Sequence, residues 1–126
     1  MVNRQSLSIV IRIPDVTLSR PDLEAALGRP LDRYEQRTDR VSAYAQIDIP
    51  DDQDQWTAAL DCVQSIGTRM QRLVSESLIG SSQMDIAVAF PSSAVMRSLE
   101  IPARLAAVTG ETGMDIGISI YLTSDA

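Results

Sequence analysis

Serines and carboxylates are the side chains in this sequence that could do chemistry, because the chain contains no histidine. Pairs of serines follow Gly80 and Pro91, in turn-like stretches where a nucleophile could stand. A serine nucleophile needs a base to activate it, and neither stretch has the pattern of a nucleophile elbow. The missing histidine also removes the commonest general base and transition-metal ligand. We therefore expect no catalytic residue and no enzyme activity.

Four aspartates form a candidate cation or amine site: Asp15, Asp51, Asp52 and Asp54. They would lie near one sheet edge if the first two strands run parallel. The stretch 51–54 lacks the glycine and the later glutamate of a calcium-binding EF-hand loop. Carboxylates are also favoured at helix starts by the helix dipole, so the sequence favours capping over metal binding. No glycine-rich phosphate loop is present, and no cofactor is expected.

The charge balance argues against a nucleic-acid partner. Eleven arginines face seventeen carboxylates among the 126 residues, which gives a net charge of −6 and repels phosphate. The amino terminus lacks the features of an export signal, and no apolar run is long enough to cross a membrane. We expect a cytoplasmic protein without membrane contact. Its one cysteine, Cys62, can form no intrachain disulfide and is expected to be a half-buried filler.

Four segments alternate apolar and polar residues with period two, which predicts strands buried on one face only. A sheet covered on both faces would instead show continuous apolar runs. The residues expected to face the core are Leu7, Ile9, Ile11 and Ile13, then Val41, Ala43, Ala45, Ile47 and Ile49, then Met84, Ile86, Val88 and Phe90, and finally Met114, Ile116, Ile118, Ile120 and Leu122.

Three helices are predicted between these strands. The first begins after Ser19 and stops at Gly28, and the third spans about 102–109. The second is the longest, from about 53 to 78, with one apolar face made of Trp56, Ala59, Leu60, Val63, Ile66, Met70, Leu73 and Val74. Residues 94–101 fit either an extra strand or a loop, and residues 30–40 are expected to be the least structured. The pattern predicts a single α+β domain over 1–126, with a mixed four- or five-stranded sheet and helices on one face. A variant of the ferredoxin-like arrangement is one form of it.

The polar face of this sheet is the candidate binding surface. Small residues and two tyrosines dominate it, whereas a solvated face usually collects Lys, Glu and Thr. An ordinary wet face, or one covered by the segment 30–40, is the alternative. The residues assigned to the candidate surface are Arg12, Tyr44, Gln46, Asp48, Asp85, Asp115, Ser119 and Tyr121.

The second half of the chain resembles a small bacterial family catalogued as domain of unknown function 4279. The resemblance is in length and in the closing run of apolar helix, glycine and a strand ending in Ile120 and Tyr121. It covers about half the chain, from Trp56 through the helix that follows to Met84 and Ile86, then residues 98–102 and the final strand. The resemblance implies no catalytic residue, because the family has no established activity.

These observations favour a noncatalytic protein-interaction module, with an immunity protein that neutralises a toxin as one form of it. The open sheet face would contact a protein partner or a second copy of the chain, as in a homodimer or another homo-oligomer. A small-ligand sensor domain is the alternative, and a histidine-free hydrolase built on pairs of aspartates ranks last.

Overall fold

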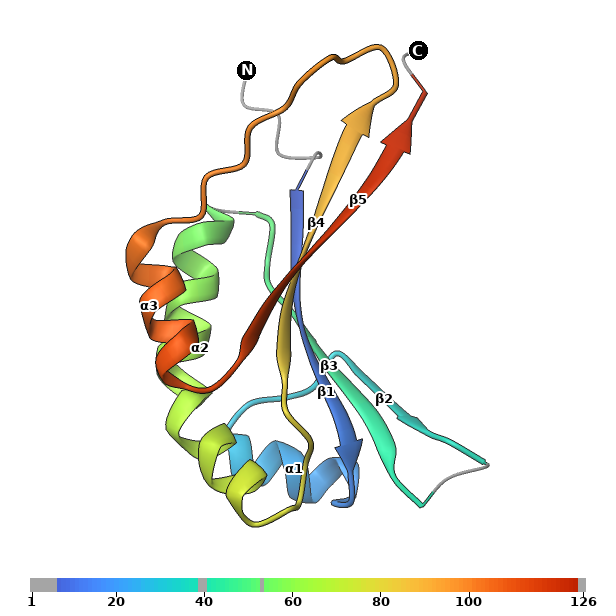
Figure 1. The fold of residues 1–126 in the computed structure, drawn as a ribbon. Helices are drawn as coiled ribbons and strands as arrows, with labels where there is room; N and C mark the ends of the chain where they lie inside the picture. Colours follow the sequence, from blue (N-terminus) through green and yellow to red (C-terminus); the bar gives the residue numbers. More distant parts are fainter. Residues whose placement is uncertain (1–6, 39–40, 53, 125–126) are drawn as a thin grey trace.

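A computed structural model of the chain describes residues 7–38, 41–52 and 54–124. In chain order it contains β1 (Leu7–Val16), α1 (Arg20–Leu27), β2 (Arg33–Gln36), β3 (Ala43–Asp48), α2 (Gln55–Ser75), β4 (Gln83–Pro91), α3 (Ala103–Glu111) and β5 (Asp115–Thr123) (Figure 1). The five strands form one sheet in the order β2-β3-β1-β4-β5. Strand β1 is antiparallel to both its neighbours, whereas β4 and β5 run parallel, so the predicted mixed sheet is confirmed.

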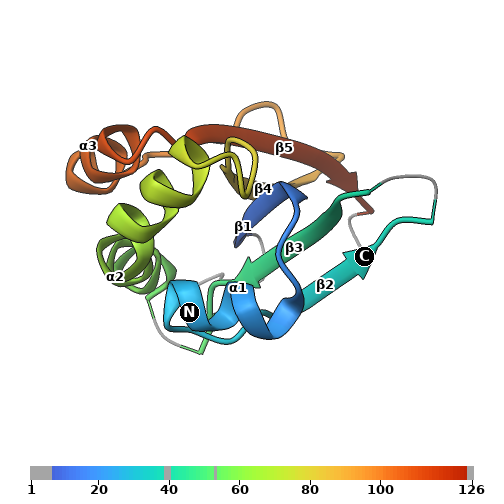
Figure 2. The same cartoon turned by 90° about the horizontal axis from the view of Figure 1, so that it is seen from below.

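The helices lie on one face of the sheet, and the other face is open (Figure 2). This arrangement confirms the prediction drawn from period-two alternation. Strands β3 and β4 flank β1 and are joined through α2, which makes a split βαβ unit of the ferredoxin-like kind. The second crossover, β4-α3-β5, instead joins neighbouring strands.

The helix boundaries follow from local sequence chemistry. The Ser19 side chain accepts a hydrogen bond from the backbone N–H of Asp22, and Gly28 ends α1 with a φ of 71°. Only glycine adopts this left-handed conformation without strain, so the helix stops there. Asp54 is the N-cap of α2, and its carboxylate accepts from the N–H of Trp56. The capping role expected for aspartates near this helix is confirmed for Asp54.

The core lies between α2 and the middle of the sheet. Among the fully buried side chains are Ile9, Ile11 and Ile13 of β1, Ile47 of β3, Met84 and Ile86 of β4, and Val63 and Ile66 of α2. Their positions match the predicted inward faces of the first three strands and of the long helix. Cys62 is 2% exposed, so the prediction of half-burial was wrong, and burial raises the pKa of its thiol.

Two predictions near residues 30–41 were wrong: the first missed a short edge strand, and the second placed the start of the next strand too early. Residues 33–36, inside the stretch expected to be least structured, form β2 and pair with β3. Its half-buried side chain, Tyr34, donates its hydroxyl to the backbone oxygen of Leu18 at 2.8 Å. Val41, predicted to face the core, lies before β3 begins and is 94% exposed. Residues 94–101 contain no strand.

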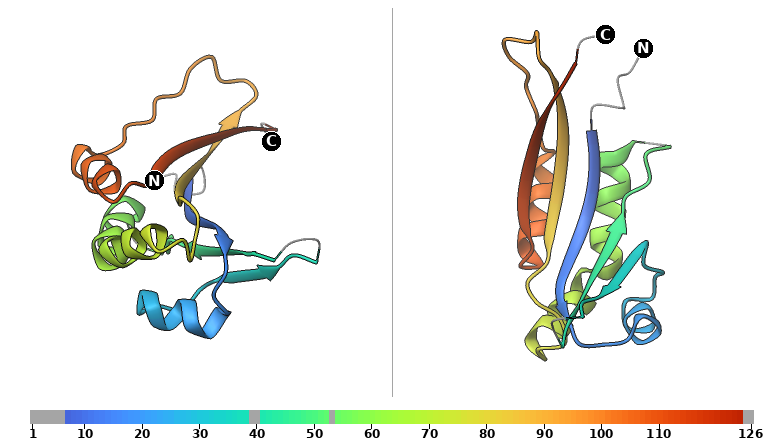
Figure 3. Two further views of the ribbon diagram at one scale, coloured as in Figure 1. Left: turned by 60° about the horizontal axis from the view of Figure 1, so that its bottom comes forward. Right: turned by 90° about the vertical axis from the view of Figure 1, so that its right-hand side faces the viewer.

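The largest difference from the predicted core is in β5. Met114 just before the strand is buried and Ile116 is half-buried, but Ile118, Ile120 and Leu122 are 49, 68 and 69% exposed. The upper halves of β4 and β5 extend beyond the ends of the helices (Figure 3). The apolar row on β5 is therefore uncovered by the described part of the chain. Val74 of α2, also predicted to be buried, is 37% exposed.

Glu24 holds the segment after α1 in place by hydrogen bonds. Replacing it should change how the free energy of unfolding depends on pH. Its carboxylate accepts from the backbone N–H of Leu31 at 2.8 Å and from Arg20 at 3.3 Å. The bond from Leu31, more than the one from Arg20, lowers the pKa of Glu24. A lowered pKa gives stability that is present above the unfolded-state pKa and lost as pH falls through the folded-state pKa. Denaturant titrations from neutral to acid pH should thus show a shallower loss of stability for Glu24→Gln than for the wild type. Parallel curves would contradict this role.

Candidate functional site

Arg12, in the middle of β1, is the centre of a hydrogen-bond network on the open face. Its Nε and Nη2 atoms donate to Oδ2 of Asp85 on β4, at 3.2 and 2.8 Å. Its Nη1 atom donates to the hydroxyl oxygen of Tyr44 at 2.8 Å and to Oε1 of Gln46 at 3.3 Å, both on β3. The guanidinium therefore ties β1 to the strands on either side of it.

Asp85 is the buried charge in this network, with 7% of its surface exposed. Its second carboxylate oxygen, Oδ1, accepts from the hydroxyl of Ser119 on β5 at 2.9 Å. The hydrogen bond with Asp85, followed by that with Tyr44, raises the pKa of Arg12 above its ordinary value. The guanidinium is thus a permanent cation facing a carboxylate whose two oxygens are both engaged.

The network continues along β3 toward the end of the sheet. The Tyr44 hydroxyl donates to Oε1 of Gln46, and Nε2 of Gln46 donates to Oδ1 of Asp48, each at 2.7 Å. The backbone N–H of Asp48 then donates to Oδ2 of Asp32 at 2.7 Å. Six of the eight predicted residues are thus connected: Arg12, Tyr44, Gln46, Asp48, Asp85 and Ser119. Asp32 was missed because it lies outside the regular strands.

The other two predicted residues, Asp115 and Tyr121, share the open face but lie on the outermost strand. Asp115 is exposed and Tyr121 is 48% exposed, and no hydrogen bond in the described part of the chain joins either side chain to the network. Tyr121 stands beside Ala89 of β4, and Ala87 is the next residue of β4 on the same face. Small side chains around one ring make this end of the face flat and apolar.

The four aspartates proposed as a cation site do not form one cluster. Strands β1 and β3 run antiparallel, so Asp15 at the end of β1 and Asp51 after β3 lie at opposite ends of the sheet. Asp51 does line an open groove of about 540 Å³ with Asp32 and Asp48. Among residues 7–38, 41–52 and 54–124, no three acidic, histidine or cysteine side chains are placed to hold a metal ion.

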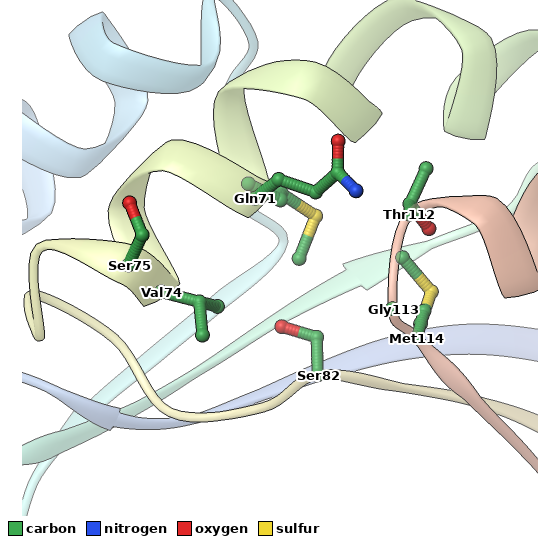
Figure 4. A pocket seen from close by; sticks show the side chains of 8 residues that line it. Gln71, Val74, Ser75, Ser82, Thr112, Gly113 and Met114 are labelled. Atoms are coloured by element: carbon green, nitrogen blue, oxygen red, sulfur yellow. The ribbon is translucent and has the colours of Figure 1, made fainter.

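A second hollow lies on the helix side, where the end of α2 meets the start of β4 and the turn from α3 into β5. It has a volume of about 280 Å³ and is lined by Met70, Gln71, Val74, Ser75, Ser82, Thr112, Gly113 and Met114. Figure 4 shows Ser82, just before β4, below Val74 and Gln71, and Met114, just before β5, beside Gly113. The Ser82 hydroxyl is buried and has no hydrogen-bond partner among the described residues. Sequence reasoning missed this hollow, because its walls come from distant segments.

The arrangement of the open face is better suited to binding another molecule than to catalysing a reaction. The polar groups of its centre are bonded to one another, which holds the surface rigid, and β5 carries no charge beyond Asp115. None of the described helices combines the length and the apolar run needed to cross a membrane. Comparisons with protein-family models, with curated proteins and with solved structures return no match. The resemblance to domain of unknown function 4279 therefore remains a prediction.

Proposed function

We propose that this chain is a noncatalytic protein-interaction module, of which an immunity-type protein is one form. Its contact surface would be the open sheet face together with the margin formed by β5. The observation that carries the proposal is the exposure of four large apolar side chains of β5: Ile118, Ile120 and Leu122 on its helix side and Tyr121 on its open face. Contiguous exposed apolar surface usually marks a place where another molecule docks. The composition of the chain fits a cytoplasmic setting.

The Arg12 network supports the proposal because it removes the mobility of the adjacent polar side chains. A partner that lands on a rigid, prearranged surface loses less conformational entropy than one that must order it. Tyr121 adds a large contact area with few rotatable bonds, which is typical of interface residues. The proposed surface therefore places a fixed polar network on the open face beside an apolar edge on β5.

Site-specific photo-crosslinking tests the proposed surface even while the identity of the partner is open. A photoreactive phenylalanine derivative replaces Tyr121 in one variant and Arg72, exposed on α2, in a matched control. We expect a discrete protein adduct, with the same chain or with another protein, from position 121 and none from position 72. Adding Tyr121→Arg protein as a competitor should leave the adduct intact, whereas unlabelled wild type should reduce it. Equal labelling at both positions would refute the proposed surface.

The hollow beside Ser82 favours a second candidate function, a small-ligand sensor domain. Its volume of about 280 Å³ is close to the lower limit for ligand pockets, roughly 300 Å³. A buried hydroxyl without a described partner has a hydrogen bond to offer to a ligand, and the surrounding methionine and valine side chains suit an apolar one. The ligand class would be a small alcohol or phenol.

A thermal-shift titration with phenol tests the sensor function. Saturating ligand at about 100 times its Kd stabilises a protein by about 2.7 kcal/mol, which is a rise of several degrees in Tm for a chain of this size. We expect this rise in the wild type and a smaller one in Ser82→Ala, which keeps the shape of the hollow. An unchanged Tm in the wild type, or an equal rise in both proteins, would rule out the site.

A further inference from the structure

The two edges of the sheet are built differently. Strand β2 has four residues, and its outward-facing Arg33 and Glu35 form an ion pair. Strand β5 pairs with β4 over nine consecutive residues without a bulge, and residues 116–123 carry no charge and no proline. Monomeric proteins protect edge strands by shortness, charge, proline or bulges. Edge β2 has two of these protections, whereas β5 has none of them along residues 116–123.

The backbone groups on the outer edge of β5 can be assigned from its bonds to β4. The N–H of Asp115 donates to Ser82, and the C=O of Thr123 accepts from Ser92. In a parallel ladder the N–H and C=O of one residue point to the same side and alternate along the strand. The even-numbered residues, Ile116, Ile118, Ile120 and Leu122, therefore direct both groups outward, where no described strand pairs with them. Their side chains are also the exposed apolar row.

We propose that a second copy of this chain occupies this edge, with the two β5 strands antiparallel about a twofold axis at Ser119. This inference rests on the proposed function and names its partner. Residue 119 is the midpoint of the strand, so this register pairs it along its whole length. Ile118 then faces Ile120 of the second copy, and Ile116 faces its Leu122. All four positions direct their hydrogen-bonding groups outward, so the two strands form a regular ladder and one ten-stranded sheet.

The side chains are self-complementary in this register on both faces. On the helix side, each pair across the axis is aliphatic, and such pairs contribute roughly 0.2–1 kcal/mol each. On the open face, Ser119 meets its own copy, and Tyr121 is opposite Gly117 of the second copy, over which the flexible Gln83 side chain of that copy lies. Residues 116–123 carry no charge, so no like charges face each other there, and Asp115 lies opposite Thr123 of the second copy at each end of the seam. A strand that matches itself in this way favours a twofold dimer over an unrelated partner.

Light scattering and sedimentation over a wide concentration range test the dimer. The wild type should show twice the chain mass of 13.8 kDa. Ile120→Lys adds a charge to the seam at an exposed position, so it should fold with an unchanged CD spectrum and lower the mass to that of a monomer. Gln36→Lys, on edge β2, is the matched control and should stay dimeric. A monomeric wild type, or a dimer that persists in Ile120→Lys, would overturn the inference.

Disulfide trapping tests the register. The paired Cα atoms at Ser119 would be about 4.5 Å apart, within disulfide range. The two copies of Thr123 would be eight residues apart along the ladder, about 27 Å. Under mild oxidation Ser119→Cys should form a covalent dimer, while Thr123→Cys and the wild type, whose Cys62 is buried, should not. Equal trapping at both positions would reject this register. The two proposals can fail separately. If the wild type is monomeric but the photoreactive group at position 121 still labels another protein, the second copy is rejected as the partner and the proposed function stands.

Discussion

Replacing Arg12 with methionine should lower the free energy of unfolding by about 2–4 kcal/mol, as measured by urea denaturation at neutral pH. The variant keeps the aliphatic part of the side chain but leaves the Asp85 carboxylate without its cation and with Ser119 as its one described partner. The Asp85 side chain is only 9% exposed, so water cannot take the place of the guanidinium. Breaking a buried pair from one side typically costs 3–5 kcal/mol. The 41% exposure of the Arg12 side chain places the expected loss toward the lower end.

The double variant Arg12→Met with Asp85→Leu is the control for this prediction. Removing both charges leaves no unpaired group behind, so the double variant should lie within about 1 kcal/mol of the wild type. The difference in free energy of unfolding between the single and the double variant then measures the cost of leaving the Asp85 carboxylate unpaired. A double variant as unstable as Arg12→Met would mean that the pair is not the cause of the loss.

The pH dependence of Arg12→Met gives an independent check. An unpaired buried carboxylate favours its neutral form, which raises its pKa above the unfolded-state value. A raised acid pKa lowers stability above that pKa, and the loss is relieved as the group takes up its proton. The deficit relative to wild type should therefore shrink as pH falls toward the ordinary aspartate pKa of about 4. A deficit that stays constant with pH would contradict an unpaired carboxylate.

The members of the Arg12 network could be predicted from the sequence, but not their connections. Period-two alternation assigns Arg12, Tyr44 and Asp85 to the polar face of the sheet wherever their strands lie. Which of them touch depends on the strand order β3-β1-β4-β5, and nothing in the local pattern specifies that order. Register matters as well, because a shift by one residue would turn a strand's polar side chains to the other face.

The error in β5 has a geometric cause. Its apolar alternation is as regular as that of β1, but a strand of nine residues is about 30 Å long. Helix α3, which leads into it, also has nine residues and spans only about 13 Å. The 21-residue α2 spans about 31 Å and is long enough to cover β1. Sequence pattern gives the direction of a side chain, while helix length determines whether anything covers it.

Strand β2 was missed because its signal is short and its composition is polar. Among its four residues only Tyr34 is apolar, so no alternation can be counted. Tyr34 flanked by Arg33 and Glu35 does follow the charge-aromatic-charge pattern of a protected edge. Shortness and charge make β2 hard to recognise in the sequence, and they also protect it from pairing with another strand. Of the two edge strands, β5 is therefore the one suited to pairing.

Ile86 and Ile118 form a matched pair that separates folding from association. They are neighbours in the β4–β5 ladder and face the same side of the sheet, but Ile86 is fully buried and Ile118 is 49% exposed. Ile86→Ala should lower the free energy of unfolding by about 3–4 kcal/mol, because it removes buried methyl groups and leaves a cavity in the core. Ile118→Ala should cost less than about 1 kcal/mol in dilute protein, where any dimer has dissociated.

Concentration then distinguishes the two roles of these isoleucines. If β5 is the seam of a dimer, wild-type stability rises with protein concentration, because dimer formation draws on the folded monomer. In Ile118→Ala the free energy of unfolding should rise less with protein concentration than in the wild type. In Ile86→Ala it should rise as much as in the wild type, but from a lower value in dilute protein. Urea denaturation of the three proteins at two concentrations measures both effects. Equal losses for the two variants in dilute protein would mean that β5 is covered in solution, and the apolar row would then belong to the core that its alternation first indicated.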